Sequence, residues 1–180
     1  MSLPEIQCFH ICFVVRDVEA SVEHFRNVLG AAEWHIGEAR PNGTRPAYGR
    51  GAGQTWELFE AKGEGDTMFH EFLANYGEGV QHIGFWTPDP RGAVEAALAG
   101  GARLLTTSVD AAGHSVSQLL PRASVQEQQL ANLGMTTFVE GGFGNVRIEY
   151  IGPAGDDFLH NWLGEKYPDI VVPPPWVPRA

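Results

Sequence analysis

The stretch FHICFVVRDVEASVEHF, residues 9–25, decides the fold because it recurs 72 positions later as QHIGFWTPDPRGAVEAA, residues 81–97. The two copies align without a gap and are identical at six positions: His10/His82, Ile11/Ile83, Phe13/Phe85, Asp17/Asp89, Val22/Val94 and Glu23/Glu95. Such an internal repeat predicts two copies of one structural unit, related by an approximate two-fold axis. Residues matched between the copies tend to converge on that axis, and two histidines that meet there suggest a metal site.

The composition is that of an ordinary globular protein, with 180 residues, a hydrophobic fraction of 43% and a charged fraction of 19%. A net charge of -10 disfavours nucleic acid and anionic membranes as partners. The sequence has neither an apolar run long enough to span a bilayer nor a charged-then-apolar leader, so we expect a cytoplasmic protein. Bridging Cys8 and Cys12 would distort their common strand, and we expect free thiols in a reducing compartment.

Each copy of the repeat begins with a strand pattern and continues into a helix pattern. From Phe9 to Val15 the odd-numbered residues are apolar and share one face, and the even-numbered residues, which include His10, share the other. Asp17 is expected to cap the first helix. Asp89, which is followed by a proline, is expected to cap the second.

Three shorter strand patterns follow each helix, separated by glycine-rich turns. They are residues 32–39, 44–51 and 54–61 in the first copy, and 103–109, 135–142 and 145–152 in the second. Each copy is therefore expected to form a βαβββ module in an α+β fold. We divide the chain into a first module (6–63), a linker (64–79), a second module (80–152) with an inserted helix in 115–133, and a C-terminal tail (153–180) that is helical and then proline-rich.

The last strand of each copy contributes a glutamate, Glu57 in the first and Glu149 in the second. Glu57 follows His10 by 47 positions and Glu149 follows His82 by 67, and the excess of 20 is about the length of the insertion. If the first and last strands of a copy are neighbours, they lie roughly 4.8 Å apart, and both side chains can reach one ion. Glu60 competes with Glu57 but lies on the opposite face. Two nitrogens and two oxygens suit one divalent ion of Zn, Ni, Co, Mn or Fe.

Ordinary structural roles are the alternative for each of these four residues. A single histidine on a strand is more often a hydrogen-bonded core residue than a ligand, and a glutamate at a strand end usually faces solvent. The recurrence of histidine with glutamate in both copies favours the metal site, because a core residue has no reason to recur together with its partner.

The sequence resembles the vicinal oxygen chelate superfamily, which includes glyoxalase I, methylmalonyl-CoA epimerase, extradiol dioxygenases and the bleomycin-resistance proteins. The resemblance covers about residues 6–152, and the segments that carry it are FHICFVVRDVEASVEHF, TWELFEA, GEGVQHIGF and FVEGGFGNVRIEYIG. It implies a glyoxalase-like fold, in which two βαβββ modules form a half-open, cup-shaped mixed sheet around one divalent metal ion. The ligands that it implies are His10, Glu57, His82 and Glu149.

The activity that the resemblance implies is that of a metal-dependent lyase or isomerase. Such an enzyme chelates a small-molecule substrate through neighbouring oxygens and transfers a proton next to a carbonyl. Glu149 is the first candidate for the catalytic base and Glu57 the second. Tyr48 or Arg50, from the strand at 44–51, is expected to orient the substrate.

Two other functions remain open. An Fe(II) extradiol-type dioxygenase would use His10, His82 and Glu149 as ligands, but Glu57 would then occupy a position that substrate or oxygen needs. A metal-free binding protein of the drug-sequestering kind needs no ligand set, so the four candidate ligands count against it. The sequence departs from the epimerases, which have an additional glutamate on the third strand where this chain has Tyr48. The pattern also leaves open whether the modules pair within one chain or across a homodimer.

Overall fold

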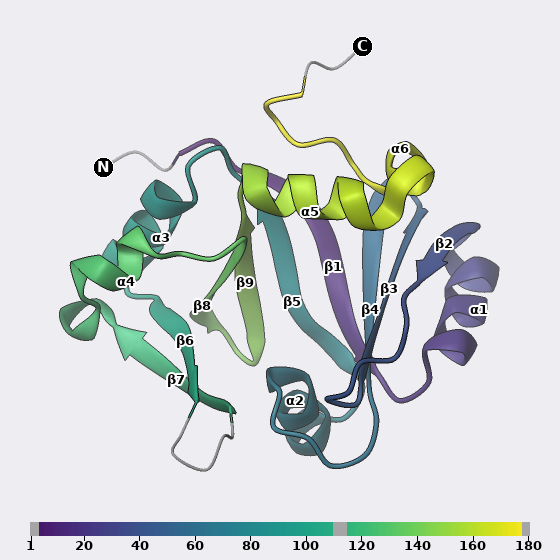
Figure 1. Cartoon of the computed structure of the whole chain (residues 1–180), viewed down its shortest axis with the longest axis horizontal. Helices are drawn as coiled ribbons and strands as arrows, with labels where there is room; N and C mark the ends of the chain where they lie inside the picture. The colour runs from purple at the N-terminus through teal and green to yellow at the C-terminus, as the bar shows by residue number, and fades with distance from the viewer. Residues whose placement is uncertain (1–3, 110–114, 178–180) are drawn as a thin grey trace.

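The computed structural model describes residues 4–109 and 115–177. Within these residues nine strands form one mixed sheet, in the order β2-β3-β4-β1-β5-β9-β8-β6-β7 (Figure 1). The first copy of the repeat provides β1 (Gln7–Val15), β2 (Glu33–Ile36), β3 (Thr44–Gly51) and β4 (Gln54–Ala61). The second copy, with its insertion, provides β5 (Gly79–Trp86), β6 (Arg103–Val109), β7 (Ser115–Pro121), β8 (Thr136–Phe143) and β9 (Val146–Ile151).

The two halves of the sheet meet along their first strands. β1 and β5 are antiparallel neighbours, while β4 lies parallel to β1 on one side and β9 lies parallel to β5 on the other. Each first strand therefore has the last strand of its own copy as a neighbour, and the halves pair within one chain. The α+β fold with an open mixed sheet, which the repeat and the resemblance predict, is confirmed.

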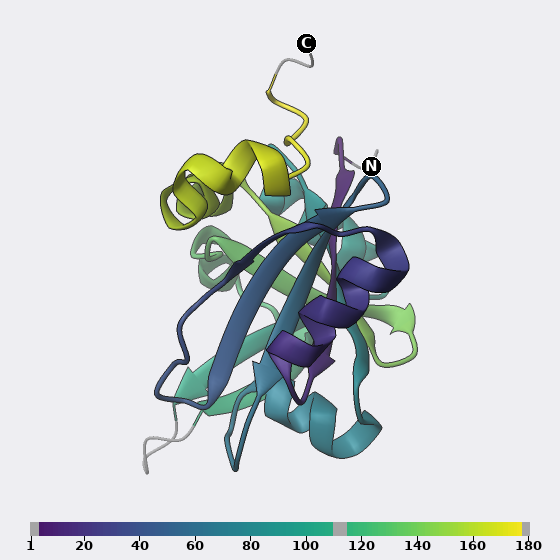
Figure 2. The same cartoon turned by 90° about the vertical axis from the view of Figure 1, so that its right-hand side faces the viewer.

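One helix from each half packs against the outer face of the sheet. α1 (Val18–Leu29) and α3 (Pro90–Ala99) begin where the sequence predicts, because the carboxylates of Asp17 and Asp89 each accept a hydrogen bond of 2.9 Å from the N–H three residues later. The apolar side of α1 packs on β3 and β4, and that of α3 on β6, β8 and β9 (Figure 2 shows α1 from its solvent side). These contacts leave the inner face of the sheet to other segments.

The linker and the insertion have secondary structure of their own. The linker contains α2 (Met68–Tyr76), which contacts β1, β4 and β5. In the insertion, β7 extends the sheet beyond β6, and η1 (Arg122–Ser124) and α4 (Glu127–Ala131) follow. The helix predicted within 115–133 is thus confined to the short α4. The strand was not predicted, because its pairing depends on the free edge of β6 and not on a local pattern.

The C-terminal tail lies across the inner face, over the ends of the central strands (Figure 1). It consists of α5 (Pro153–Leu163), η2 (Gly164–Lys166), α6 (Tyr167–Ile170) and an extended segment, and residues 178–180 lie outside the described part. The Thr55 hydroxyl donates to the Ile170 carbonyl at 2.9 Å and accepts from the Val172 N–H at 3.0 Å. The tail is therefore bound to its own sheet. No helix of the described residues is long and apolar enough to cross a membrane.

Two irregularities interrupt the ladder between β1 and β5, and both precede a repeated histidine. The pairing skips Phe9 between Cys8 and His10, and it skips Gln81 next to His82. A bulge of this kind redirects the side chain of the extra residue. The Phe9 ring accordingly lies 4.6 Å from the His10 ring and packs with Trp86 and the tail on the inner face, whereas Phe13 and Val15 pack with α1 on the outer face. The prediction that Phe9 shares their face was wrong.

Candidate metal centre

Four side chains from the four central strands of the sheet meet on its inner face. They are His10 from β1, Glu57 from β4, His82 from β5 and Glu149 from β9, which we call the candidate centre. All four are buried, with relative exposures between 0% and 5%. The structure thus brings together all four residues that the sequence analysis singled out as candidate ligands.

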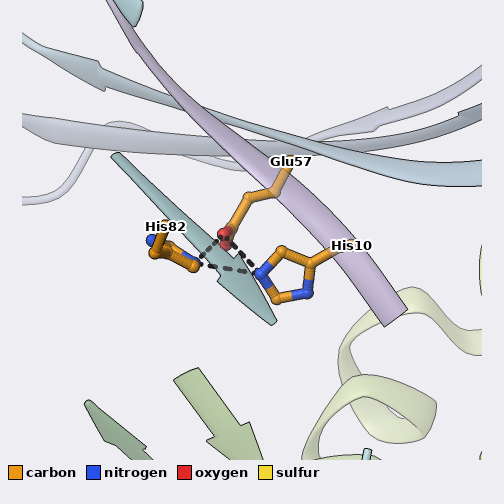
Figure 3. Close-up of side chains that lie close together, drawn as sticks. All are labelled: His10, Glu57 and His82. Atoms are coloured by element: carbon orange, nitrogen blue, oxygen red, sulfur yellow. Dashed lines mark hydrogen bonds and ion pairs between the residues drawn. The ribbon is translucent and has the colours of Figure 1, made fainter. Parts of the chain in front are cut away.

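The distances within the centre are those of neighbouring ligands around one ion. The Nε2 atoms of His10 and His82 lie 2.9 Å apart. Each of them lies 3.1–3.3 Å from the Oε2 atom of Glu57 and from the Oε2 atom of Glu149. Figure 3 shows three of these side chains pointing at one another. Two atoms bound at right angles to one ion, each at about 2.1 Å, lie about 3 Å apart. His10, Glu57 and His82 are also close enough to serve together as a three-ligand set.

The chemistry of the centre calls for a positive charge between these atoms. Two buried carboxylates without compensation would repel each other strongly. The Oε2 atom of Glu149 is buried and accepts no hydrogen bond within the described residues, although it lies close to both imidazoles. Imidazole nitrogen with carboxylate oxygen is a donor set that suits Zn, Ni, Co, Mn or Fe. The residues therefore fit a divalent ion.

The ring of His82 is oriented by the residue that precedes it. The oxygen Oε1 of Gln81 can only accept a hydrogen bond, so the Nδ1–H group of His82 donates to it, at 2.5 Å. This tautomer leaves the lone pair of Nε2 directed into the centre, as a ligand requires. The role of Gln81 was not predicted from the sequence, because strict alternation along a strand would place this residue on the other face.

Burial and charge oppose each other in setting the pKa values of the centre. Burial alone would lower the pKa of His10, but the nearby carboxylates of Glu57 and Glu149 outweigh it and raise the pKa to about 9. The pKa of His82 is raised for the same reason. Burial would conversely raise the pKa of both glutamates, but the imidazoles lower it, well below the ordinary range for Glu57 and less for Glu149.

The two carboxylates of the centre have different neighbours. In register beside Glu57 lie Tyr48 on β3 and Cys12 on β1, which carry a phenol and a thiol. The corresponding neighbours of Glu149 are Phe138 on β8 and Gly84 on β5, neither of which has a polar side-chain group. Glu149 is therefore the carboxylate with the less polar surroundings.

A cavity of ≈ 320 Å³ opens onto the candidate centre, and we call it the site cavity. Glu57, His82 and Glu149 lie in its wall. Six aromatic side chains also line the site cavity: Tyr48, Phe59, Phe69, Phe138, Phe158 and Trp162. Phe158 and Trp162 belong to α5, so the tail forms part of the wall. This role of the tail was not predicted, because no local feature of its sequence indicates where it docks.

Of the other residues considered from the sequence, one lines the site cavity and the others do not. Tyr48 lines the site cavity, as expected of a residue that orients a substrate. Arg50 does not, since its guanidinium donates to two carbonyls of the tail. Glu60 lies on the outer face, where it accepts a hydrogen bond of 2.9 Å from the first N–H of α1. Cys8 and Cys12 are free thiols, the first exposed and the second buried.

Comparison with solved structures supports the fold. The chain is similar to methylmalonyl-CoA epimerase from Mycobacterium tuberculosis, with a TM-score of 0.56 and 19% identity, over 85% of this chain and 92% of that one. The Streptomyces coelicolor methylmalonyl-CoA epimerase gives a TM-score of 0.55 and 24% identity, over 84% and 98% of the two chains. A hypothetical protein from Bacillus halodurans gives 0.57 and 14%, over 82% and 94%. At these identities the likeness concerns the fold alone.

Comparison with protein families and with curated proteins gives two further results. No curated protein matches the sequence significantly. The family described as the glyoxalase/bleomycin resistance protein/dioxygenase superfamily matches residues 9–118, which include three of the four residues of the candidate centre and more than half of the chain. The chain therefore belongs to the glyoxalase/bleomycin resistance protein/dioxygenase superfamily, the vicinal oxygen chelate proteins.

Proposed function

We propose that this protein is a metal-dependent isomerase or lyase that transfers a proton next to a carbonyl of a small substrate with neighbouring oxygens. The convergence of two imidazoles and two carboxylates at one cavity carries this proposal. His10, Glu57, His82 and Glu149 would hold a divalent ion, which supplies a Lewis acid for the carbonyl oxygen when bound. The likeness in fold to methylmalonyl-CoA epimerases supports an isomerase-type reaction.

Glu149 is the base in this proposal. Of the two carboxylates it has the apolar neighbours, Phe138 and Gly84. Apolar surroundings raise the pKa of a carboxylate, and the more basic carboxylate is the better proton acceptor. The side chain of Glu149 lines the site cavity, so a carbon next to a carbonyl of a bound substrate can approach its carboxylate. Glu57 is the second candidate for this role.

Tyr48 and the aromatic wall would position the substrate. Burial, and then the negative charges of Glu57 and Glu149, raise the pKa of Tyr48 well above its ordinary range. The phenol therefore stays protonated at neutral pH and can donate a hydrogen bond to a substrate oxygen. The six rings around the site cavity limit the access of water, which strengthens electrostatic interactions within it.

Metal analysis and isotope exchange test the proposal. Protein purified without added ions should contain close to one divalent ion per chain, and Glu149→Gln should lose proton exchange with a carbonyl substrate in deuterated buffer by at least about a hundredfold. Glu60→Gln, on the outer face, is the matched control and should retain exchange. A metal-free protein, or full exchange in Glu149→Gln, would refute the assignment. Oxygen uptake with catechols under Fe(II) would point to the dioxygenase instead.

A further inference from the structure

A second, larger cavity adjoins the site cavity on the inner face of the sheet. It has a volume of ≈ 900 Å³ and lies against β6, β8 and α4. The two cavities share Met68, Thr136 and Phe138 in their walls. The larger cavity therefore lies next to the space in which a substrate of the candidate centre would bind. The residues that line both cavities indicate which chemical groups such a substrate can carry.

Both walls contain few charged groups. The described residues that line the larger cavity are apolar or carry neutral amides and hydroxyls, and none of them is charged. The site cavity is lined by the six aromatic rings and by the candidate centre. Arg40 is the only other charged residue among the described residues that line it.

The backbone around Arg40 fixes the position from which its side chain extends. The Arg40 N–H donates to the Thr44 carbonyl at 2.8 Å, and its own carbonyl accepts from the Gly43 N–H at 3.0 Å. Gly43 has a φ of 77°, and a Cβ there would lie 2.5 Å from the Lys62 carbonyl oxygen, so this turn fits closely against the end of β4. The guanidinium carbon lies 5.4 Å from the centre of the Phe59 ring in the cavity wall.

The charge of Arg40 is not neutralised by a neighbouring acid. Within residues 4–109 and 115–177 no carboxylate is paired with Arg40, whereas Arg45, Arg91 and Arg147 each form an ion pair. A planar guanidinium with free donors matches a carboxylate in two parallel hydrogen bonds. The two glutamates of the centre offset the charge of a divalent ion, so Arg40 is the group available for a negative charge on the substrate.

We propose that Arg40 recognises a single carboxylate on a compact substrate with an aromatic or similarly apolar body. The ring or chain of this substrate packs among the aromatic side chains, and its neighbouring oxygens face the candidate centre. The inference rests on the proposed function for the position of those oxygens. The recognition of the carboxylate by Arg40 does not depend on it.

The same walls argue against a coenzyme A thioester as the substrate. Such a molecule carries several phosphate groups, which proteins usually bind with arginine, lysine or helix N-termini. The larger cavity offers neutral amides and hydroxyls, which suit an uncharged polar group. We therefore infer a substrate class different from that named for the epimerases of similar fold.

Calorimetric titration of zinc-loaded protein with protocatechuate and with its methyl ester tests the role of Arg40. Both probes carry the chelating catechol, and they differ in the negative charge. The wild-type protein should bind protocatechuate at least about tenfold more tightly than the ester. Arg40→Gln should abolish this preference, and Arg40→Lys should retain part of it. Arg16→Gln, at an exposed arginine outside both cavities, is the control and should leave it unchanged.

Three results would overturn the inference: equal affinities for the two probes in the wild-type protein, a preference that survives in Arg40→Gln, and displacement of protocatechuate by equimolar acetyl-CoA. Failure of the proposed metal site is distinguishable from all three, because the protein would then bind no zinc. A different reaction at the same metal site would leave the comparison of the two probes unchanged. If the protein binds no zinc, phenylpropanoate and phenylpropanol are titrated into the metal-free protein. These two probes differ in the negative charge, as the first pair does, but they do not need a metal ion for binding. The carboxylate should again be preferred, and Arg40→Gln should again remove the preference.

Discussion

Single residues hold the two histidines of the candidate centre in different ways. The Nδ1–H group of His82 donates to Gln81, while the Nδ1 atom of His10 has no hydrogen-bond partner among the described residues. The His10 ring is instead fixed by packing, because it contacts the Phe9 ring and lies over Gly84. Phe9 and Gln81 occupy equivalent positions of the repeat, and both are bulge residues. One imidazole is therefore oriented by a hydrogen bond and the other by contact.

Replacing Gln81 should weaken metal binding. Gln81→Met keeps the length of the side chain but removes the acceptor for His82, whose ring can then adopt the other tautomer. Loss of such a partner typically lowers metal affinity by about ten- to a hundredfold. Competition with a chelator of known affinity measures the effect, with Gln128→Met on exposed α4 as the control. An unchanged dissociation constant would show that Gln81 does not orient the ligand.

Adding one methyl group at Gly84 should disturb His10 directly. A Cβ at this position would lie 2.4 Å from Cε1 of the imidazole, so Gly84→Ala must displace the ring. We expect a loss of about 1–3 kcal/mol in the free energy of unfolding, together with weaker metal binding. Gly79→Ala on the same strand is the matched control, since a Cβ there meets nothing within 4 Å. Equal stabilities of the two variants in urea would contradict this reading.

Among the elements of the fold, the tail has the most direct effect on the site cavity. α5 brings Phe158 and Trp162 into the cavity wall, and the Trp162 ring lies 5.5 Å from the ring of Tyr48. Hydrogen bonds at the end of the tail hold it in place, including that from the Trp86 indole to the Val172 carbonyl at 2.9 Å. The shape of the cavity thus depends on attachments outside the repeat.

The hydroxyl of Thr55 is the attachment that can be tested most cleanly. Thr55→Val preserves the shape of the side chain but leaves the Ile170 carbonyl and the Val172 N–H without this partner. We expect a loss of about 1–3 kcal/mol in unfolding free energy, and faster proteolysis within the tail. Thr55→Ser keeps the hydroxyl and should lose less. If the valine variant were as resistant to protease as the wild-type protein, the hydroxyl would not secure the tail.

On the scale of the whole molecule, the candidate centre joins the two halves of the sheet. One histidine and one glutamate come from each half, and all four lie beside the ladder between β1 and β5. An ion bound by these four residues would contact both halves of the sheet.

This arrangement predicts a stability that depends on pH in opposite ways with and without metal. In the metal-free protein the folded pKa of His10 is about 9, above its ordinary value of 6.5, so its contribution is fully present below about pH 6.5 and is lost as pH rises through 9. The loss in the free energy of unfolding should reach about 3 kcal/mol.

A metal ion replaces the proton on His10, so the affinity of the protein for the metal should rise over the same pH interval. Urea denaturation with chelator and with zinc, at about pH 6 and about pH 8.5, measures both trends. Parallel pH profiles would contradict the prediction.

The sequence predicted the parts of the molecule that depend on periodic patterns. The offset of 72 positions identified the equivalent histidines, and the pairing of first and last strands in each copy was enough to bring Glu57 and Glu149 to them. The face of Phe9 and the role of Gln81 depend on how β1 pairs with β5. The alternation of residues within a single strand does not predict this pairing. Arg40 could be found only once the turn before β3 was placed beside the aromatic wall.

The ladder between β1 and β5 also has a consequence for measurement. Since the candidate centre spans this ladder, separation of the two strands and release of the ion become a single event. Amide hydrogens of the two strands should then exchange with solvent more slowly in proportion to the fraction of molecules that carry an ion. The exchange rates of these amides would therefore measure how many molecules carry a metal ion, without a substrate and without knowledge of the reaction.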